Sequence, residues 1–184
     1  MERTSITAIL LAGGQGSRMN HRDKAWATHK GRPLIRHVLE RVEPHVFHVI
    51  ISRNRDNPAY ADLPYPAYSD DLPDFQGPLA GITSCLPHVE TSLTLVIPCD
   101  TPNLPVNLVP RLLEALGDRS LAVAEENGRL QQLVFLAKTE VLGSIEDYLL
   151  TGKRSVMGWL ERQDIAAVGF DNEFENINRT SQLR

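Results

Sequence analysis

Residues 5–24 have the sequence SITAILLAGGQGSRMNHRDK, and this stretch decides the fold. Its first part, residues 5–11, is a short apolar run with β-branched side chains that leads directly into glycines. Such a run is typical of a strand that is buried on both faces of a parallel sheet. The stretch therefore predicts a protein of the α/β class in which a buried strand opens into a glycine-rich loop.

Downstream of this stretch, apolar runs alternate with segments whose apolar residues recur at helical spacing. We expect strands at residues 47–51, 93–98, 121–124, 133–137 and 165–170. We expect helices at residues 33–43, 79–89, 107–116, 141–150 and 155–160, and a long irregular loop at residues 54–77. Strands separated by helices form βαβ units. The order therefore predicts a single domain over residues 1–184, a three-layer α/β sandwich with a mostly parallel, Rossmann-like sheet.

The composition is that of an ordinary globular protein, with 42% apolar and 23% charged residues among 184. These values exclude a disordered chain, a collagen-like fibre and a coiled coil. The net charge of −4 provides no basic field for nucleic acid, and no apolar run approaches the roughly 20 residues that cross a bilayer. Two cysteines without metal-ligand spacing favour a reducing compartment. We therefore expect a soluble, cytoplasmic monomer that binds neither nucleic acid nor a membrane.

The glycine-rich loop does not match two well-known phosphate-binding loops. A P-loop needs Gly-Lys followed by Ser or Thr, and no such triplet follows the strand. The dinucleotide fingerprint finds two of its glycines at Gly14 and Gly16, but Met19 stands in the third place. The acidic residue expected after the second strand is replaced by Ser52 and Arg53. Both kinds of loop are therefore excluded.

The loop instead leads to two cations, Arg18 and Lys24. Fixed cations close to a triphosphate stabilise the charge that develops during transfer, especially where water is excluded. Asp100 follows the predicted strand at residues 93–98, so its carboxylate is expected at the same edge of the sheet. One carboxylate together with substrate phosphates is a donor set that suits Mg²⁺. The alternatives are a tight turn with solvated charges and, for Asp100, an Asx turn.

Four segments, in this order along the chain, match the motifs of one family. They are LAGGQGSRMNHRDK at residues 11–24, GPLAG at 77–81, PCDTP at 98–102 and NINRT at 176–180. Together they resemble the molybdenum cofactor guanylyltransferases, the MobA group of the nucleotidyltransferases. The resemblance extends over nearly the whole chain, and it implies the nucleotidyltransferase form of the Rossmann-like sheet.

The resemblance implies a nucleotide site and a pterin site. The residues implied for the guanine nucleotide are Leu11, Ala12, Gly13, Gly14, Lys24, Ser52, Asp70, Gly77, Pro78, Leu79 and Asp100. Those implied to be catalytic are Arg18, Lys24 and Asp100, of which Asp100 also holds Mg²⁺. Those implied for the pterin are Arg154, Asn176 and Asn178.

Several of these positions also have a purely structural interpretation that the sequence leaves open. Asp70 can be a solvated loop residue, the GPLAG segment can simply begin a helix, and Arg154 can belong to a charged turn. The two asparagines can serve turn chemistry before Thr180.

The chain also departs from the family pattern. Ser52 stands where the family often has Asn, with Asn54 two residues later, and Gln132 stands where Pro is common. Gln131 and Gln132 precede an apolar strand, and we expect them to face the same cleft.

The resemblance implies a Mg²⁺-dependent transfer of GMP from GTP to the terminal phosphate of molybdopterin, which yields the guanine dinucleotide cofactor and pyrophosphate. Molybdenum-cofactor insertion proteins or molybdoenzyme chaperones would receive the product. Two alternatives are a nucleotidyltransferase that uses CTP or a sugar 1-phosphate acceptor, and a noncatalytic GTP-binding regulatory protein. The LAGG and GPLAG segments favour guanine, because the related cytidylyl enzymes tend to have LAAG in the first place and lack the second.

Overall fold

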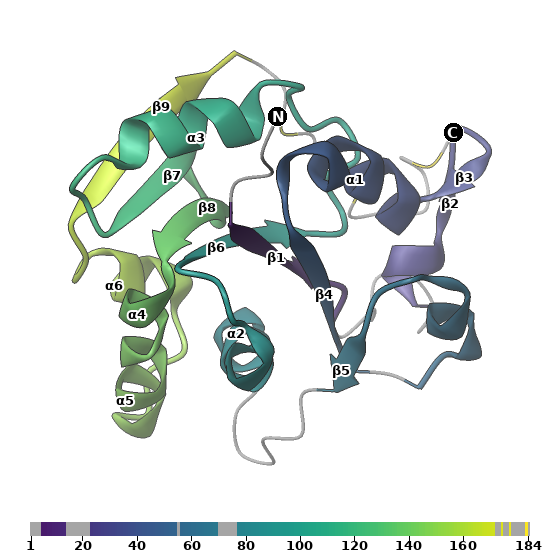
Figure 1. Cartoon of the computed structure of the whole chain (residues 1–184), viewed down its shortest axis with the longest axis horizontal. Helices are drawn as coiled ribbons and strands as arrows, with labels where there is room; N and C mark the ends of the chain where they lie inside the picture. The colour runs from purple at the N-terminus through teal and green to yellow at the C-terminus, as the bar shows by residue number, and fades with distance from the viewer. Residues whose placement is uncertain are drawn as a thin grey trace.

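The structure, a computed structural model, describes residues 5–13, 23–54, 56–69, 77–171, 174, 177 and 183. Its centre is a seven-stranded sheet with the order β5-β4-β1-β6-β8-β7-β9 (Figure 1). The strands are β1 (Ile6–Leu11), β4 (His48–Arg53), β5 (Ala67–Ser69), β6 (Leu93–Pro98), β7 (Leu121–Glu126), β8 (Arg129–Lys138) and β9 (Ile165–Phe170). β5, β4, β1 and β6 run parallel, as do β7 and β9, whereas β8 is antiparallel to both neighbours. The prediction of a mostly parallel sheet is confirmed.

The first strand, β1, lies in the middle of the sheet, and all six of its residues are buried. This burial explains why the run contains no charged residue. Leu11 at its end pairs with Ser52 of β4 on one side and with Pro98 of β6 on the other. Because these strands are parallel and end at the same level, the loops that follow them leave the sheet at one edge.

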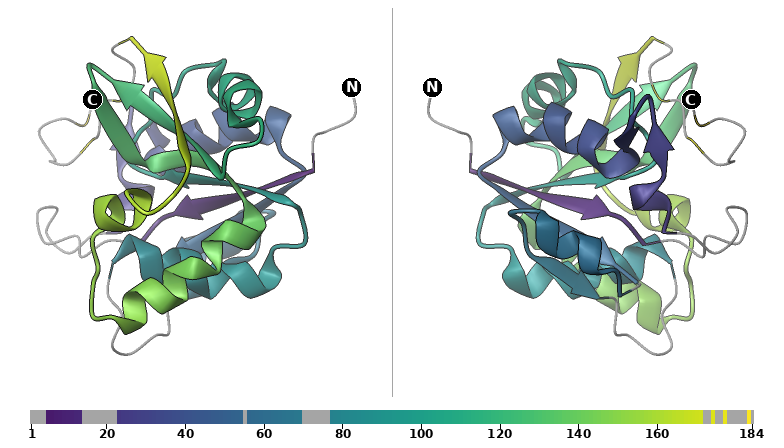
Figure 2. Two further views of the ribbon diagram at one scale, coloured as in Figure 1. Left: turned by 90° about the vertical axis from the view of Figure 1, so that its left-hand side faces the viewer. Right: turned by 90° about the vertical axis from the view of Figure 1, so that its right-hand side faces the viewer.

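Helices cover both faces of the sheet, which confirms the three-layer sandwich (Figure 2). α1 (Leu34–Val42) and α3 (Leu108–Leu116) lie on one face. The other face is covered by α2 (Pro78–Cys85), α4 (Thr139–Leu142), α5 (Ser144–Leu150) and α6 (Val156–Leu160). Each face has its own cluster of buried apolar side chains.

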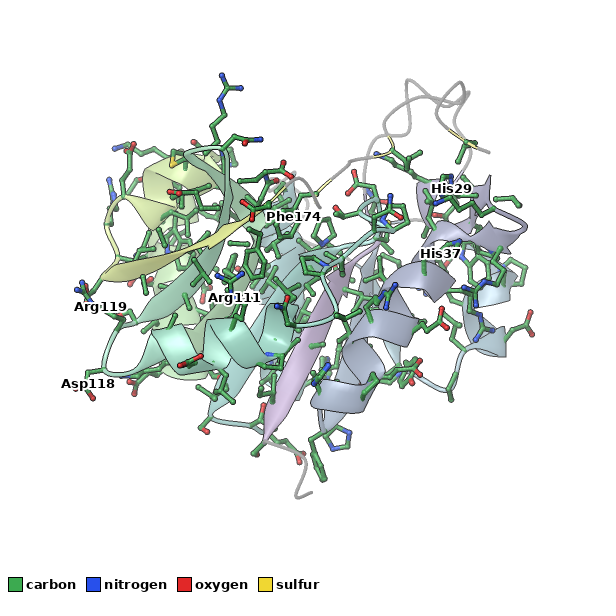
Figure 3. The ribbon with its side chains drawn as sticks, turned by 90° about the horizontal axis from the view of Figure 1, so that it is seen from above. His29, His37, Arg111, Asp118, Arg119 and Phe174 are labelled. Atoms are coloured by element: carbon green, nitrogen blue, oxygen red, sulfur yellow. The ribbon has the colours of Figure 1, made fainter. Side chains whose placement is uncertain are left out.

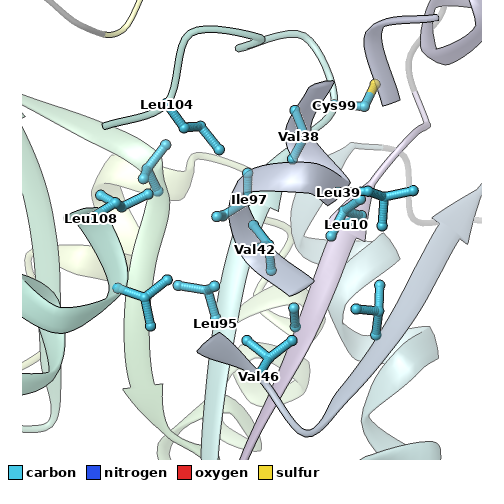
Figure 4. Close-up of a cluster of buried hydrophobic side chains, with 14 of the residues drawn as sticks. Leu10, Val38, Leu39, Val42, Val46, Leu95, Ile97, Cys99, Leu104 and Leu108 are labelled. Atoms are coloured by element: carbon cyan, nitrogen blue, oxygen red, sulfur yellow. The ribbon is translucent and has the colours of Figure 1, made fainter. Parts of the chain in front are cut away.

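The core under α1 shows how the predicted helical periodicity becomes packing. Val38, Leu39 and Val42 lie on one face of the helix and pack toward Leu10 of β1 and Ile97 of β6 (Figure 4). All five side chains are almost completely buried. Burying each such side chain contributes about 1.5–3 kcal/mol, so this core holds the ends of β1 and β6 in place against the helix.

No helix is expected between residues 121–124 and 133–137, and β7 and β8 follow each other directly. These strands form a hairpin whose turn is Asn127-Gly128, and both turn residues have positive φ, at 52° and 74°. Positive φ at both positions is the signature of a type I′ turn, which joins antiparallel strands directly. β8 therefore runs against its neighbours.

The remaining differences concern short elements and boundaries. The region expected to be an irregular loop contains a 3₁₀ turn, Pro58–Asp62, and the edge strand β5. A small hairpin of β2 (Thr28–His29) and β3 (Arg32–Pro33) precedes α1. The helix expected at residues 141–150 is divided into α4 and α5, and that expected at 79–89 ends as α2 with a 3₁₀ turn, Leu86–His88. Within the described residues, no helix has both the length and the apolar content needed to cross a bilayer.

Candidate functional site

The candidate site lies at the edge where β1, β4 and β6 end. Just beyond their last residues, the amide of Ala12 donates to the carbonyl of Ser52 at 2.8 Å. On the other side, the amide of Cys99 donates to the carbonyl of Leu11 at 3.0 Å. These bonds extend the parallel ladders by one step, so the start of the glycine-rich loop lies beside the loop that carries Asp100.

Lys24 and Asp100, which the sequence singled out separately, are in direct contact. The Nζ atom of Lys24 lies 2.7 Å from Oδ2 of Asp100, although the residues are 76 positions apart. Their side chains are only 20% and 22% exposed, so the pair is partly shielded from water. Charges in such a setting interact more strongly than on the open surface. The site therefore brings a cation and an anion together in the cleft that Ala12 and Gly13 also line.

The backbone that carries Lys24 is held by Asp23. The Asp23 carboxylate accepts hydrogen bonds from the amide of Ala25 at 3.2 Å, from Nδ2 of Asn57 at 3.1 Å and from the hydroxyl of Tyr60 at 3.3 Å. The first of these caps the 3₁₀ turn Lys24–Trp26. The other two connect that turn to the Pro58–Asp62 turn and its N-terminal cap Asn57. The backbone of Lys24 is therefore held by contacts with a second segment.

The phenol of Tyr60 is the buried member of this network. Burial, followed by the negative charge of Asp23, raises its pKa far above the ordinary value, so the hydroxyl stays protonated and can donate. The ring of Trp26 meets the Tyr60 ring edge-on, with centroids 5.5 Å apart. Sequence reasoning missed Asp23, Asn57 and Tyr60 as contributors to the site. Asp23 could have been noticed as a capping residue next to Lys24, but no local signal identifies the other two.

A cleft of about 530 Å³ opens at this edge. Six residues predicted for the nucleotide line it, namely Leu11, Ala12, Gly13, Lys24, Pro78 and Asp100. We call residues 11–13, Lys24 and residues 99–101 the charged wall. Opposite lie residues 130–134 of β8 and Val156 of α6, which we call the neutral wall. The expectation that Gln131 and Gln132 face this cleft is confirmed.

The predicted residues Ser52, Gly77 and Leu79 are not among the described residues that line this cleft. Ser52 is buried, and its Oγ lies 2.5 Å from the place that a Cβ of Gly81 would occupy, so its hydroxyl points at α2. Leu79 is buried in the core beneath α2. Gly77 precedes α2 with a φ of 111°, which an L-residue rarely adopts. Their contact with a nucleotide stays a prediction.

Gly13 at the mouth of the cleft lies against Asn54. A Cβ atom at Gly13 would lie 3.3 Å from Cγ of Asn54, which is closer than an ordinary contact. Glycine at this position therefore lets the Asn54 side chain approach the loop backbone. The amide that follows β4 in this chain thus lies beside the predicted nucleotide loop.

The end of the chain returns to Asp100. Ile177 is buried, and its amide donates to the carbonyl of Asp100 at 2.8 Å. Further upstream, the amide of Phe174 donates to the Glu126 carboxylate at 3.1 Å, and the Arg111 guanidinium lies over the ring of Phe170 (Figure 3 labels Arg111 and Phe174). The first contact places Ile177 beside the charged wall, and the second ties Phe174 to the end of β7.

Some predicted residues lie elsewhere or cannot be placed. Arg154 donates from Nη1 to the carbonyls of Leu149 and Lys153, both at 2.8 Å, and it does not line the cleft. Its pterin contact stays a prediction. The predicted site residues that lie outside the described residues are Gly14, Arg18, Asp70, Asn176 and Asn178.

The donor set at Asp100 decides what kind of metal the site suits. The described residues contain no group of three or more His, Cys, Asp or Glu side chains that could enclose a metal ion. Cys99 is buried, and burial together with the Asp100 charge raises the pKa of its thiol, so it is a poor metal ligand. A single carboxylate fits a hard cation that takes its other ligands from substrate phosphates and water, as Mg²⁺ does.

Comparison with known proteins is consistent with this geometry. Residues 8–167 match the family model described as MobA-like NTP transferase domain. Proteins named molybdenum cofactor guanylyltransferase are 37% identical in Bordetella petrii, covering 100% of this chain and 98% of the relative, and 36% identical in Shewanella putrefaciens, covering 94% and 91%. The crystal structure of molybdopterin-guanine dinucleotide biosynthesis protein A from Archaeoglobus fulgidus superposes with a TM-score of 0.76 at 22% identity, covering 96% of this chain and 94% of that one. At that identity the superposition establishes the shared fold.

Proposed function

Because the chain belongs to the MobA-like NTP transferase family, we propose that it is a molybdenum cofactor guanylyltransferase. It would transfer GMP from GTP to the terminal phosphate of molybdopterin and release pyrophosphate. The observation that carries the proposal is the Lys24–Asp100 pair beside Ala12 and Gly13, in a cleft with a second, uncharged wall. The names of relatives at 36–37% identity over nearly the whole chain support the choice of substrates.

The charged wall suits a triphosphate with a divalent cation. Lys24 would move its ammonium group from the Asp100 carboxylate to the phosphates, because these carry more negative charge. Asp100, released from Lys24, would hold Mg²⁺. When bound, the cation would draw charge from the phosphate oxygens during transfer. The amide group of Gly13, which follows the ladder bond of Ala12, would donate to the phosphates.

The acceptor needs little activation from the protein. A phosphomonoester has a second pKa of about 6, so its oxygen is already ionised at neutral pH. That oxygen forms a bond to the α-phosphorus of GTP, while the bond between the α-phosphorus and the bridging oxygen breaks and its electron pair leaves with pyrophosphate. The protein then acts by positioning two anions and neutralising their repulsion. No general base is required at the site.

We further propose the metal, the state of the protein, the recipients of the product and the base. The reaction depends on Mg²⁺, and the protein works as a cytoplasmic monomer. The product passes to molybdenum-cofactor insertion proteins or molybdoenzyme chaperones. Guanine is the base, since the chain has Gly13 where the cytidylyl relatives tend to have Ala. An Ala at this place would crowd Asn54, whose side chain lies 3.3 Å from the position of the added Cβ.

Nucleotide selectivity tests the proposal. The purified protein is incubated with Mg²⁺ and molybdopterin, with GTP, CTP, ATP or UTP in turn, and pyrophosphate is measured. We expect release with GTP and at most trace release with the others, and chelation of Mg²⁺ should stop it. Release with CTP would overturn the assignment of the base. Nucleotide binding without any release would indicate a noncatalytic protein, and turnover only with a sugar 1-phosphate would replace the acceptor.

A further inference from the structure

The cleft opens where two neighbouring strands of the sheet diverge. β6 and β8 are paired from Leu93 and Lys138 as far as Val96 and Phe135. Beyond that pair, β6 continues to Pro98 and β8 extends back to Arg129 without further pairing between them. Pro98 lines the cleft from one side and residues 130–134 line it from the other. The neutral wall is therefore the part of β8 that no longer pairs with β6.

A large bulge shapes this edge. Between β7 and β8 the pairing changes register from Val123–Phe135 to Glu125–Leu130. In this interval β7 contributes only Ala124, whereas β8 contributes residues 131–134. Bulges of this kind redirect side chains and occur next to active sites. The extra residues here include both glutamines of the neutral wall, Gln131 and Gln132.

The two walls differ in chemistry as well as in backbone. Of the lining residues that the structure describes, the charged ones are Lys24 and Asp100, both on the charged wall. The neutral wall combines the two glutamine amides with aliphatic side chains at Leu130, Leu133 and Val156. Each amide offers donors and an acceptor without a charge. Such a surface suits a flat, uncharged ring system with hydrogen-bonding edges.

The order of the strands indicates which substrate carries that ring. β6, which ends two residues before Asp100, lies between β1 and β8 in the sheet. Ala12 and Gly13, which follow β1, therefore lie on the opposite side of Asp100 from the neutral wall. In phosphoryl transfer the attacking and leaving groups are roughly in line, on opposite sides of the phosphorus. If the nucleotide occupies the β1 side, the β8 side remains for the acceptor.

We infer that the bulged segment of β8, residues 131–133, receives the uncharged heterocycle of the acceptor, and that Gln131 and Gln132 determine acceptor specificity by hydrogen bonding to its edge. This inference rests on the proposed function and names the part of the cleft that receives its second substrate. Under that function the heterocycle is the pterin of molybdopterin. Gln131 is half-buried and Gln132 is exposed, so replacing either leaves the core of the sheet unchanged.

The test compares Gln131→Ala, Gln132→Ala and the double variant with the wild type, using pyrophosphate release at varied GTP and at varied molybdopterin. Each hydrogen bond that is lost should raise KM for molybdopterin roughly fivefold, with KM for GTP unchanged. Equilibrium binding of molybdopterin in the absence of GTP should weaken to the same extent. Gln163→Ala is the matched control, because Gln163 donates to the carbonyl of Trp159 and does not line the cleft.

Two results would overturn the inference. A selective rise in KM for GTP would show that the bulge contacts the nucleotide instead, and unchanged constants for both substrates would show that it contacts neither. Thermal unfolding at the wild-type temperature confirms that a variant is folded. Absence of turnover in the wild type would refute the proposed function, whereas normal wild-type turnover with either result above would refute only the inference.

Discussion

The charged wall and the neutral wall of the cleft are built in different ways. The charged wall follows strands that run parallel and end level, and it is braced by contacts with remote segments, including Asp23 with Tyr60 and Ile177 with Asp100. The neutral wall is one strand of a hairpin, shaped by a bulge. The difference indicates that groups which balance charge must be held from several directions, because they act only at the right distance. An uncharged ring needs no such precise placement of charges, so residues of one strand, β8, can bind it.

Removing the carboxylate from the charged wall should have the largest effect. Asp100→Ala deletes both the partner of Lys24 and the proposed ligand of Mg²⁺, so we expect turnover to fall by roughly a thousandfold or more. The side chain is at the surface of the cleft, so the fold should persist, as judged by circular dichroism and thermal unfolding. Asp118→Ala, an exposed change in the turn after α3, is the matched control and should retain activity (Figure 3). Full turnover of Asp100→Ala with Mg²⁺ as the only metal contradicts the assignment.

Removing the hydrogen bonds of Asp23 tests whether the position of Lys24 matters as much as its charge. Asp23→Ala removes the carboxylate that accepts hydrogen bonds from Ala25, Asn57 and Tyr60, and it does not change the Lys24 side chain itself. We expect kcat/KM for GTP to fall roughly 10- to 100-fold, because a small displacement of Lys24 weakens its contact with the phosphates.

Asp23→Asn is the control for this change, since it keeps one acceptor oxygen and should recover part of the loss. The unfolding free energy of Asp23→Ala should also fall by about 1–3 kcal/mol, because the buried Tyr60 hydroxyl loses the Asp23 carboxylate as an acceptor. If stability falls while kcat/KM is unchanged, Asp23 has only a structural role.

The sequence predicted the central part of the molecule better than its margins. β1, β6, α1 and α3 were predicted nearly at their observed limits, because each has a complete hydrophobic pattern within its own residues. β2, β3 and β5 have only two or three residues each, so no periodicity can reveal them. The type I′ turn at Asn127-Gly128 was visible in the sequence, but it was not recognised.

The candidate site shows the same division. Lys24 and Asp100 follow motifs that stand out locally, and the structure brings them together at 2.7 Å. The bond from Asn57 to Asp23 joins residues 34 positions apart, and only the folded chain brings them together. Ser52 is predicted to contact the nucleotide, and that contact stays a prediction, while the structure places its hydroxyl next to Gly81.

The contact between Ser52 and Gly81 allows a smaller test of how tightly β4 and α2 pack next to the charged wall. In Gly81→Ala the added Cβ would lie 2.5 Å from Oγ of Ser52, so something must shift. We expect the unfolding free energy to fall by about 1–3 kcal/mol, measured by urea denaturation. Adding Ser52→Ala should restore most of the loss, because it removes the atom in conflict. Equal and additive losses in the two single variants would contradict this explanation.

The hairpin beside the neutral wall should respond most weakly. Gly128→Ala places a side chain on a residue with φ of 74° but meets no atom within 4 Å, so strain alone should cost about 1 kcal/mol of unfolding free energy. Gly169→Ala in β9 is the control, because it also meets no atom and its φ is not positive. KM for GTP should be unchanged in both. A raised KM for GTP in Gly128→Ala would mean that the two walls are not independent.

The fate of the α-phosphate tests the central claim most directly, because the charged wall is assigned to transfer at that phosphorus. GTP labelled at the α-phosphate or at the γ-phosphate is incubated with molybdopterin, Mg²⁺ and the wild-type protein, and the products are separated. We expect the α-label in the pterin dinucleotide and the γ-label in pyrophosphate. Transfer of the γ-label to molybdopterin, or release of the α-label as GMP or GDP alone, would contradict that claim.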